Sequence, residues 1–153
     1  MSDPRAGLRL SLDAAEMDVD AIHAYLSGES YWARGIPRET VARAIRHSLC
    51  FGVLDGAAQV AFARVITDRA TFGYLADVYV LPAYRGRGLG RWMMESITAH
   101  PELQGLRRWG LMTRDAHGLY AGFGFTPLAH PEYAMERTEP GLYARLADPV
   151  AAG

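Results

Sequence analysis

The sequence predicts a single α/β (α+β) domain, with a central mixed but mostly antiparallel sheet and about four flanking helices. The chain has 153 residues, of which 50% are hydrophobic and 22% charged, a composition typical of one globular domain. Asp55-Gly56 stands between two alternating apolar segments and is the strongest two-residue signal for a β-hairpin. Beyond a third extended segment, helical and extended patterns alternate, which indicates a mixed sheet.

The spacing of apolar residues places each element along the chain. Apolar residues at intervals of two predict strands, and apolar residues at i, i+3 and i+4 predict helices. Asp115 is the predicted N-cap of the fourth helix. We expect strands over residues 8–12, 50–54, 57–67, 71–81 and 107–113 and again from Phe125 onward, and helices over residues 18–27, 37–48, 89–100 and 115–122.

The chain carries no internal repeat, low-complexity block or long linker, so we expect one domain over residues 1–153, with residues 146–153 as a frayed tail. Its net charge of -1 argues against a nucleic-acid partner, and no apolar run is long enough to predict a membrane span. Cys50, the single cysteine, is expected to be a buried strand residue in a reducing compartment. With no signal peptide recognisable, we expect a cytoplasmic protein without a metal site.

Two residue types are missing, and their absence excludes whole classes of enzyme. All sixteen basic residues are arginine, and the sequence contains no lysine and no asparagine. A Walker A nucleotide site and a pyridoxal enzyme both need a lysine, so both are excluded. A Cys/His/Asn protease is excluded by the missing asparagine. No G-x-S-x-G elbow occurs, so no nucleophilic serine is predicted.

Residues 79–91 predict a strand that runs through a glycine-rich turn into an amphipathic helix. Glycines let the backbone of such a turn approach a ligand, and the free N–H groups of the first helical turn attract an anion. Arginines add a bidentate grip on phosphate oxygens. A Rossmann site is excluded, because Met93 stands where its third glycine would be. We therefore expect a pyrophosphate to bind at Arg85, Gly86, Arg87, Gly88, Leu89, Gly90 and Arg91.

Two motifs resemble those of the GNAT superfamily of acetyl-CoA-dependent N-acetyltransferases. Its motif A, R/Q-x-x-G-x-G/A, is matched in order at Val80, Pro82, Arg85, Gly88 and Gly90. Its motif B, A-x-x-L-Y-x-K-x-G-F, is matched at Ala116, Leu119, Tyr120, Gly124 and Phe125. Thr113 stands where motif B usually carries asparagine, and Gly122 where it carries lysine. The resemblance covers about residues 8–145.

The resemblance implies a sheet whose fourth and fifth strands, here about residues 71–81 and 107–113, splay apart to admit the pantetheine arm of acetyl-CoA. Backbone groups of Val78, Tyr79 and Val80 would then meet the amides of this co-substrate, and an N–H at Tyr79 or Val80 would stabilise the oxyanion. Tyr120 matches the motif B tyrosine that acts as general acid to the CoA thiolate. The implied reaction is direct attack of a primary amine on the thioester.

The general base is left open by the sequence. Asp77 is one candidate, acting directly or through water, because an aspartate within an apolar strand is costly to bury without a partner. The alternative for Asp77 is an ion pair with Arg64 on the neighbouring strand. His117, one turn before Tyr120, is a second titratable candidate. A chain of waters could also replace any single base.

The acceptor is left open as well. Tyr31, Trp32 and Arg34 belong to an aromatic loop in the part of the chain that walls the substrate cleft in this superfamily, and His117 is grouped with them. Trp92 and Trp109 are predicted to be core residues. We expect a small-molecule or peptide amine as acceptor and a monomer or homodimer. The rival interpretation is a non-catalytic acyl-CoA sensor on the same fold, which would not need an acid at the sulfur.

Overall fold

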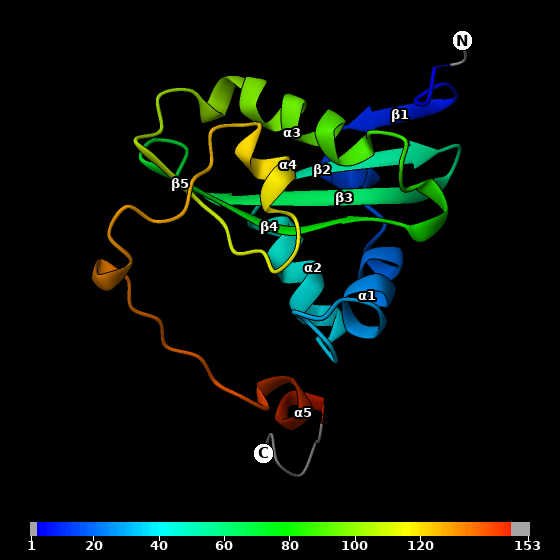
Figure 1. Ribbon diagram of the computed structural model, residues 1–153. Helices are drawn as coiled ribbons and strands as arrows, with labels where there is room; N and C mark the ends of the chain where they lie inside the picture. The colour runs from blue at the N-terminus through cyan, green and yellow to red at the C-terminus, as the bar shows by residue number, and fades with distance from the viewer. Residues whose placement is uncertain (1–2, 148–153) are drawn as a thin grey trace.

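The computed structural model describes residues 3–147, and its centre is one five-stranded sheet (Figure 1). The strands stand in the order β1-β2-β3-β4-β5. They are β1 (Leu8–Ser11), β2 (Leu49–Asp55), β3 (Ala58–Thr67), β4 (Phe72–Val80) and β5 (Arg108–Gly110). The α-helices are α1 (Val19–Gly28), α2 (Arg38–Arg46), α3 (Leu89–Ala99), α4 (His117–Ala121) and α5 (Leu142–Ala147).

The first four strands are antiparallel neighbours, and β5 runs parallel to β4. This pairing confirms the predicted mixed, mostly antiparallel sheet. The β2–β3 hairpin turns at Asp55-Gly56 as predicted, and Gly56 adopts φ 60°, a conformation that favours glycine. A parallel neighbour requires the chain to cross the sheet, and α3 makes this crossing between β4 and β5.

Helices cover both faces of the sheet, so the protein has two apolar cores. On one face lie α3 and α4, with Met93 and Ile97 of α3 fully buried against the sheet (Figure 1). On the other face α1 and α2 enclose Ile22 and Val41 around Phe62 of β3. Each helix turns its apolar stripe inward, as the helical spacing of these residues predicts.

Two predicted boundaries in the second half of the chain are wrong. β5 has three residues, Arg108–Gly110, where the sequence predicts a strand over residues 107–113. Asp115 is not the N-cap of α4, because the cap residue is Ala116 and makes no side-chain cap bond. Instead the Thr113 hydroxyl accepts a hydrogen bond from the Ala116 N–H at 3.1 Å. The start of α4 is therefore stabilised by the Thr113 side chain, three residues before Ala116, and not by a side-chain bond of the cap residue.

The strand predicted from Phe125 onward is also wrong. Residues 126–141 contain only a single 3-10 turn, Pro131–Tyr133, and α5 follows. Prolines at 127, 131 and 140 remove backbone donors that a strand would need. Of the predicted frayed tail, residues 146 and 147 close α5, and residues 148–153 lie outside the described residues.

Other predictions about burial can be compared directly. Cys50 is buried on β2 as expected, and burial raises the pKa of its thiol to about 11. Trp92 and Trp109 are not fully buried but pack, partly exposed, against the edge of the α3-side core. Over residues 3–147, no helix combines the length and the apolar character needed to cross a bilayer.

Candidate active site

The parallel pair β4–β5 separates soon after it begins. Phe72, Gly73 and Tyr74 of β4 pair with β5, whereas residues 75–80 of β4 have no strand on that side among the described residues. A cavity of about 690 Å³ opens where the strands part. Its walls come from β4, from the loop after α1, from the segment between β5 and α4, and from α5. This is the splayed arrangement of the fourth and fifth strands that was expected.

A β-bulge bends β4 at the cavity wall. Arg64 of β3 pairs with Ala76 and Phe62 pairs with Tyr79, so two residues of β4 stand opposite one of β3. Asp77, one of these two, has φ 55°, in the left-handed region that aspartate tolerates better than most residues. The bulge turns the Asp77 carboxylate toward the cavity, which Asp77 and Val78 both line.

The Asp77 carboxylate is held by two donors from different elements. Arg64 Nε donates to Oδ2 at 2.6 Å, and the indole Nε1 of Trp32 donates to Oδ1 at 2.8 Å. A second nitrogen of Arg64, Nη1, donates to the Ser48 hydroxyl at 3.1 Å. The side chains of the Arg64–Asp77 pair are only 16% and 11% exposed. The Arg64–Asp77 ion pair, considered above as the alternative role of Asp77, therefore forms. The hydrogen bond from Trp32 to the same carboxylate joins the aromatic loop to β4.

The aromatic loop reaches across the cavity to the segment after β5. The Tyr31 hydroxyl accepts a hydrogen bond from the Arg114 N–H at 3.0 Å, and the Arg114 guanidinium stacks over the Tyr31 ring at 3.9 Å from its centroid. Tyr31 and Trp32 both line the cavity. Arg34 and His117 are exposed and do not line it, so the structure does not bring them to the other site residues, and their binding roles stay predictions.

Tyr120 is the one strongly buried tyrosine of α4 and lines the same cavity. It is 7% exposed, and its ring contacts Phe125 edge-on, with centroids 6.1 Å apart. No residue between 3 and 147 forms a hydrogen bond with its hydroxyl. Burial, followed by smaller effects of Tyr31 and Asp115, raises the pKa of Tyr120 to about 12. The phenol is therefore protonated at neutral pH, and it lines the cavity with its hydroxyl free to donate a hydrogen bond.

The glycine-rich turn lies beyond the end of β4 and opens α3. Gly86 and Gly88 adopt φ 80° and 73°, and Gly88 is the N-cap of α3 in the left-handed conformation. Within the described residues, no backbone hydrogen bond uses the N–H groups of residues 86–91. A Cβ at Gly86 would meet no atom within 4 Å. Open space and a row of unused amide donors suit an oxygen-rich anion, as the sequence predicts.

The arginines of the turn are not equivalent. Arg85 turns back, with Nε donating to the Val80 carbonyl at 3.0 Å and Nη2 to the Tyr25 hydroxyl at 3.1 Å. Arg87 donates to the Pro4 carbonyl at 2.8 Å. Arg91 extends along α3, 3.5 Å from Glu95. Arg85 therefore braces the end of β4, Arg87 is bound only to a neutral carbonyl among the described residues, and Arg91 contacts the Glu95 carboxylate on the surface of α3.

Two cationic residues of the site were not singled out by sequence reasoning. Arg5 lies beside the turn, with Nη2 4.0 Å from the Cβ position of Gly88, although 83 residues separate them. Arg114 lines the active-site cavity and stacks on Tyr31. Arg5 carries no local signal, because only the folding of the N-terminal loop against α3 places it there. For Arg114 a sequence signal exists, because it lies between Thr113 and motif B, next to residues already expected at the site.

The sheet is split between two parallel strands, a cavity opens at the split, and a turn suited to an anion stands at the start of the crossing helix. Together these features define an acetyltransferase fold of the GNAT type. The sequence profile described as Acetyltransferase (GNAT) domain matches residues 46–127. Over the described residues no group of three or more His, Cys, Asp or Glu side chains is placed to hold a metal. The chain belongs to the GNAT acetyltransferase family, whose members use acetyl-CoA as co-substrate.

Individual relatives agree with this assignment. A protein of Gibberella zeae named as a candidate acetyltransferase is 38% identical over 138 residues, covering 76% of this chain and 77% of the relative. A crystal structure from Xanthomonas campestris pv. campestris, described as a candidate acetyltransferase of the GNAT family, is 55% identical with a TM-score of 0.87, covering 90% of this chain and 96% of that one. Glucosamine-6-phosphate N-acetyltransferase from Arabidopsis thaliana, 13% identical with a TM-score of 0.61 over 86% of this chain and 97% of its own, shares the fold.

Proposed function

We propose that the protein transfers an acetyl group from acetyl-CoA to a primary amine by direct attack of the amine on the thioester. The observation that carries this proposal is the Tyr120 hydroxyl, which lines the cavity between the parted strands and has no hydrogen bond within the described residues. Bound acetyl-CoA would supply the activated thioester. The residues of this chain would bind it, orient the amine and stabilise the charges that develop.

The glycine-rich turn would hold the pyrophosphate. The unused N–H groups of residues 86–91 and the positive end of the α3 dipole provide fixed donors there. Arg5 and Arg91 would add positive charge beside the turn, since Arg5 lies near Gly88 and Arg91 lies on the first turn of α3. Both also contact the Glu95 carboxylate, at 3.7 and 3.5 Å, so part of this charge is already compensated. Arg85 contributes indirectly, because its bond to the Val80 carbonyl fixes the end of β4 next to the turn.

The oxyanion donor would come from the backbone of β4. Leu81 N–H donates to the Val60 carbonyl of β3 at 2.9 Å, so the residue before it, Val80, directs its N–H to the opposite edge of the strand. That edge faces the gap, because β5 has already left β4 there. Of the two residues expected for this role, the pairing pattern therefore favours Val80 over Tyr79, whose ring is buried against Tyr25.

Tyr120 would act at the leaving sulfur. Its raised pKa of about 12 keeps the phenol protonated through the physiological range. A thiol has an ordinary pKa near ~8.5, so complete transfer of the phenolic proton to a thiolate is uphill. The hydrogen bond to the sulfur as its charge develops is therefore the main contribution that this general acid would make.

The amine must lose a proton before it attacks, because a free alkylammonium has a pKa near ~10.4. Asp77 lines the cavity and is the candidate base. Both of its oxygens already accept hydrogen bonds, from Arg64 and Trp32, so receiving a proton requires one of these contacts to open. A water between the amine and Asp77 would satisfy this requirement without dismantling the ion pair.

The acceptor would be a small-molecule or peptide amine with an apolar or flat neighbouring group. Tyr31, Trp32 and Met112 contribute aromatic and thioether surface to the cavity. Arg114 adds a cation that has no acidic partner among the described residues. Arg34 and His117 would act only on a part of the acceptor that extends beyond the cavity.

The decisive experiment measures free thiol released from acetyl-CoA across a panel of amines. Once a substrate is found, Tyr120→Phe should lower kcat by roughly one to three orders of magnitude while KM changes little, because the ring and its packing are kept. Tyr133→Phe is the matched control, since Tyr133 is 75% exposed and lies outside the cavity. Wild-type turnover in Tyr120→Phe would show that the thiolate leaves without this donor.

The same assay decides between the enzyme and the acyl-CoA sensor. A sensor would bind acetyl-CoA with normal affinity by calorimetry and release thiol with none of the amines. An enzyme would release thiol with at least one of them, and the rate would depend on Tyr120.

A further inference from the structure

Arg114 places a positive charge at the wall of the active-site cavity. It belongs to the segment between β5 and α4, lines the cavity and is exposed. Arg64, the other arginine that lines this cavity, is already paired with Asp77. No ion pair among residues 3–147 includes Arg114, and its guanidinium donates no hydrogen bond to a described residue. The cavity therefore has one cation whose donors are unused within the described chain.

The Arg114 guanidinium is held in position by the aromatic loop. It stacks over the Tyr31 ring, 3.9 Å from the centroid, and the Arg114 backbone N–H donates to the Tyr31 hydroxyl at 3.0 Å. Stacking uses the face of the planar group and leaves its N–H edges free. Those edges form a fork that matches the two oxygens of a carboxylate. An arginine held by its face and unpaired at its edges is therefore suited to bind an acid group of a ligand.

The acidic residues of the cavity do not supply this partner. Both oxygens of Asp77 are bound, by Arg64 and by Trp32. Asp115 also lines the cavity, but it forms no ion pair with Arg114 although the two are consecutive. A single guanidinium balances one negative charge, whereas a phosphate group carries nearly two at neutral pH. The unpaired charge at Arg114 therefore favours a carboxylate over a phosphate.

A row of contacts joins Arg114 to the expected place of the amine. Tyr31, on which the guanidinium stacks, meets Trp32 edge-on with ring centroids 5.0 Å apart. The Trp32 indole donates to Asp77 Oδ1 at 2.8 Å. Two adjacent rings therefore separate the cation from the candidate base, a span of at most about four extended residues at ~3.5 Å each. One small molecule can reach both ends of this row.

We propose that Arg114 binds a carboxylate of the acceptor, so that the acceptor is an amino acid or a short peptide whose amine lies near Asp77. This inference rests on the acetyl transfer proposed above and names the class of its substrate. The carbon chain between the two charged groups lies along the rings of Tyr31 and Trp32, which line the same cavity. An amine without an acid group gains nothing from the guanidinium.

Matched pairs of acceptors test the proposal by free-thiol release. Linear amino acids from glycine to 6-aminohexanoate are each compared with the alkylamine of the same chain length, and phenylalanine is compared with 2-phenylethylamine. In at least one pair the carboxylate should raise kcat/KM about 10- to 100-fold, the effect of one hydrogen-bonded charge pair. A wild type that shows no such preference in any pair overturns the proposal, while acetyl transfer to the alkylamines would still support the proposed function.

Variants of Arg114 assign the preference to this residue. Arg114→Gln should bring the ratio within the preferred pair close to one, mainly by raising KM for the amino acid. Arg114→Glu should favour the diamine of the same length instead. If the stack on Tyr31 were merely structural, activity with both members of the pair would fall together and their ratio would stay. A preference that survives in Arg114→Gln overturns the proposal.

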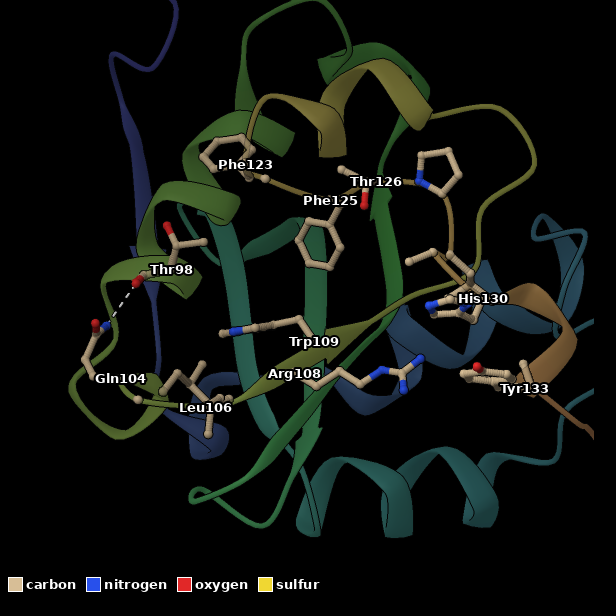
Figure 2. A pocket seen from close by; sticks show the side chains of 17 residues that line it. Thr98, Gln104, Leu106, Arg108, Trp109, Phe123, Phe125, Thr126, His130 and Tyr133 are labelled. Atoms are coloured by element: carbon tan, nitrogen blue, oxygen red, sulfur yellow. Dashed lines mark hydrogen bonds between the residues drawn. The ribbon is translucent and has the colours of Figure 1, made fainter.

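Arg108→Gln is the matched control for these variants. Arg108 is also an exposed arginine without an acidic partner among the described residues. Figure 2 shows it among the side chains that line a separate cavity, of about 630 Å³. Its removal should leave the ratio within the preferred pair unchanged. An equal loss in Arg108→Gln would mean that the total charge of the protein, and not the position of Arg114, sets the preference.

Binding without turnover separates this inference from the proposed function. Ligand-observed NMR with 3-phenylpropanoate, which has a carboxylate and no amine, should detect binding that Arg114→Gln weakens about tenfold or more. Such binding with no thiol release from any amine would keep the carboxylate site and reject acetyl transfer. Equal binding to both proteins overturns the site. Tighter binding of phenyl phosphate than of 3-phenylpropanoate would assign it to a phosphate and overturn the proposed substrate class.

Discussion

The chain up to Tyr120 and the chain after it differ in what they bury. Every buried hydrophobic residue of the described chain lies between Met17 and Tyr120, on both faces of the sheet. After Tyr120, residues 126–141 are all exposed, and only Phe123, Phe125, Leu142 and Tyr143 are partly covered. The first region therefore supplies the stability of the fold, and the second has little intramolecular reason to hold its shape. Such a segment is free to serve recognition.

The largest contrast should appear in stability. Phe62→Ala should lower the free energy of unfolding by about 3–5 kcal/mol, because Phe62 is fully buried in the α1–α2 core and its loss leaves a cavity. Met135→Ala in the exposed segment 126–141 should change it by less than about 0.5 kcal/mol. Urea denaturation measures both. Equal effects would show that this segment is packed against the rest of the chain.

The next largest effect concerns the glycine-rich turn within the stable region. Gly88→Glu should weaken CoA binding by about a hundredfold or more, because it adds bulk and negative charge beside the unused amide donors. Gly88→Ala is the matched control, since it shares the strain of the left-handed conformation at φ 73° without the charge. Calorimetry measures binding, and circular dichroism checks the fold. Normal CoA binding by a folded Gly88→Glu variant would remove the pyrophosphate from this turn.

The Asp77→Asn variant distinguishes two roles of Asp77, as a partner in the ion pair with Arg64 and as the general base. Asp77→Asn should lower the free energy of unfolding by about 1–3 kcal/mol, because Arg64 is then left without its ionic partner in a mostly buried place. If Asp77 is also the base, turnover should fall most at low pH and recover in part as pH rises, because more of the amine is then already neutral. Reduced stability with intact turnover would assign Asp77 to the ion pair alone.

Trp32→Phe is the companion to that variant. It removes the indole hydrogen bond to Asp77 while Arg64 stays paired. We expect KM for the amine to rise with little change in stability, since Trp32 is 41% exposed. A loss of stability equal to that of Asp77→Asn would show that the loop contact, rather than the ion pair, is the structural element.

The smallest expected effect is a fall in the free energy of unfolding at alkaline pH, caused by two buried groups, Cys50 and Tyr120. Burial raises the pKa of Cys50 to about 11 and that of Tyr120 to about 12, above the ordinary values of a thiol and a phenol. The folded protein therefore keeps protons that the unfolded chain loses, and the free energy of unfolding should fall as pH rises from about 9 toward 11. Cys50→Ala should show a shallower fall in urea titrations over this range. An unchanged slope would mean that the thiol does not contribute.

Sequence reasoning predicted the hairpin and the glycine-rich turn because these depend on local patterns, and the alternation of extended and helical segments indicated a mixed, mostly antiparallel sheet. Asp55-Gly56 turns wherever two alternating segments flank it, and α3 forms because its apolar residues recur at helical spacing after Gly88. The same reasoning placed Tyr120 on a short helix. It also listed ion pairing with Arg64 as one fate of Asp77, since both strands were recognised and only their register was missing.

Local sequence patterns do not predict which distant segments of the chain come into contact. Three contacts of the site form only when the sheet and helices are assembled. They join Tyr31 to Arg114 across 83 residues of sequence, Arg85 to Tyr25, and Arg5 to the turn at Gly88. The predicted last strand fails although β5 has an unpaired edge among the described residues, because the prolines at 127, 131 and 140 interrupt the segment and remove backbone donors. The sequence by itself therefore determined the elements and the chemistry of the turn, because these follow from propensity and spacing. The parting of the fourth and fifth strands was expected from the motif resemblance, but the tertiary structure alone decided which side chains line the cavity there and that residues 126–141 are exposed, because both depend on which distant segments meet.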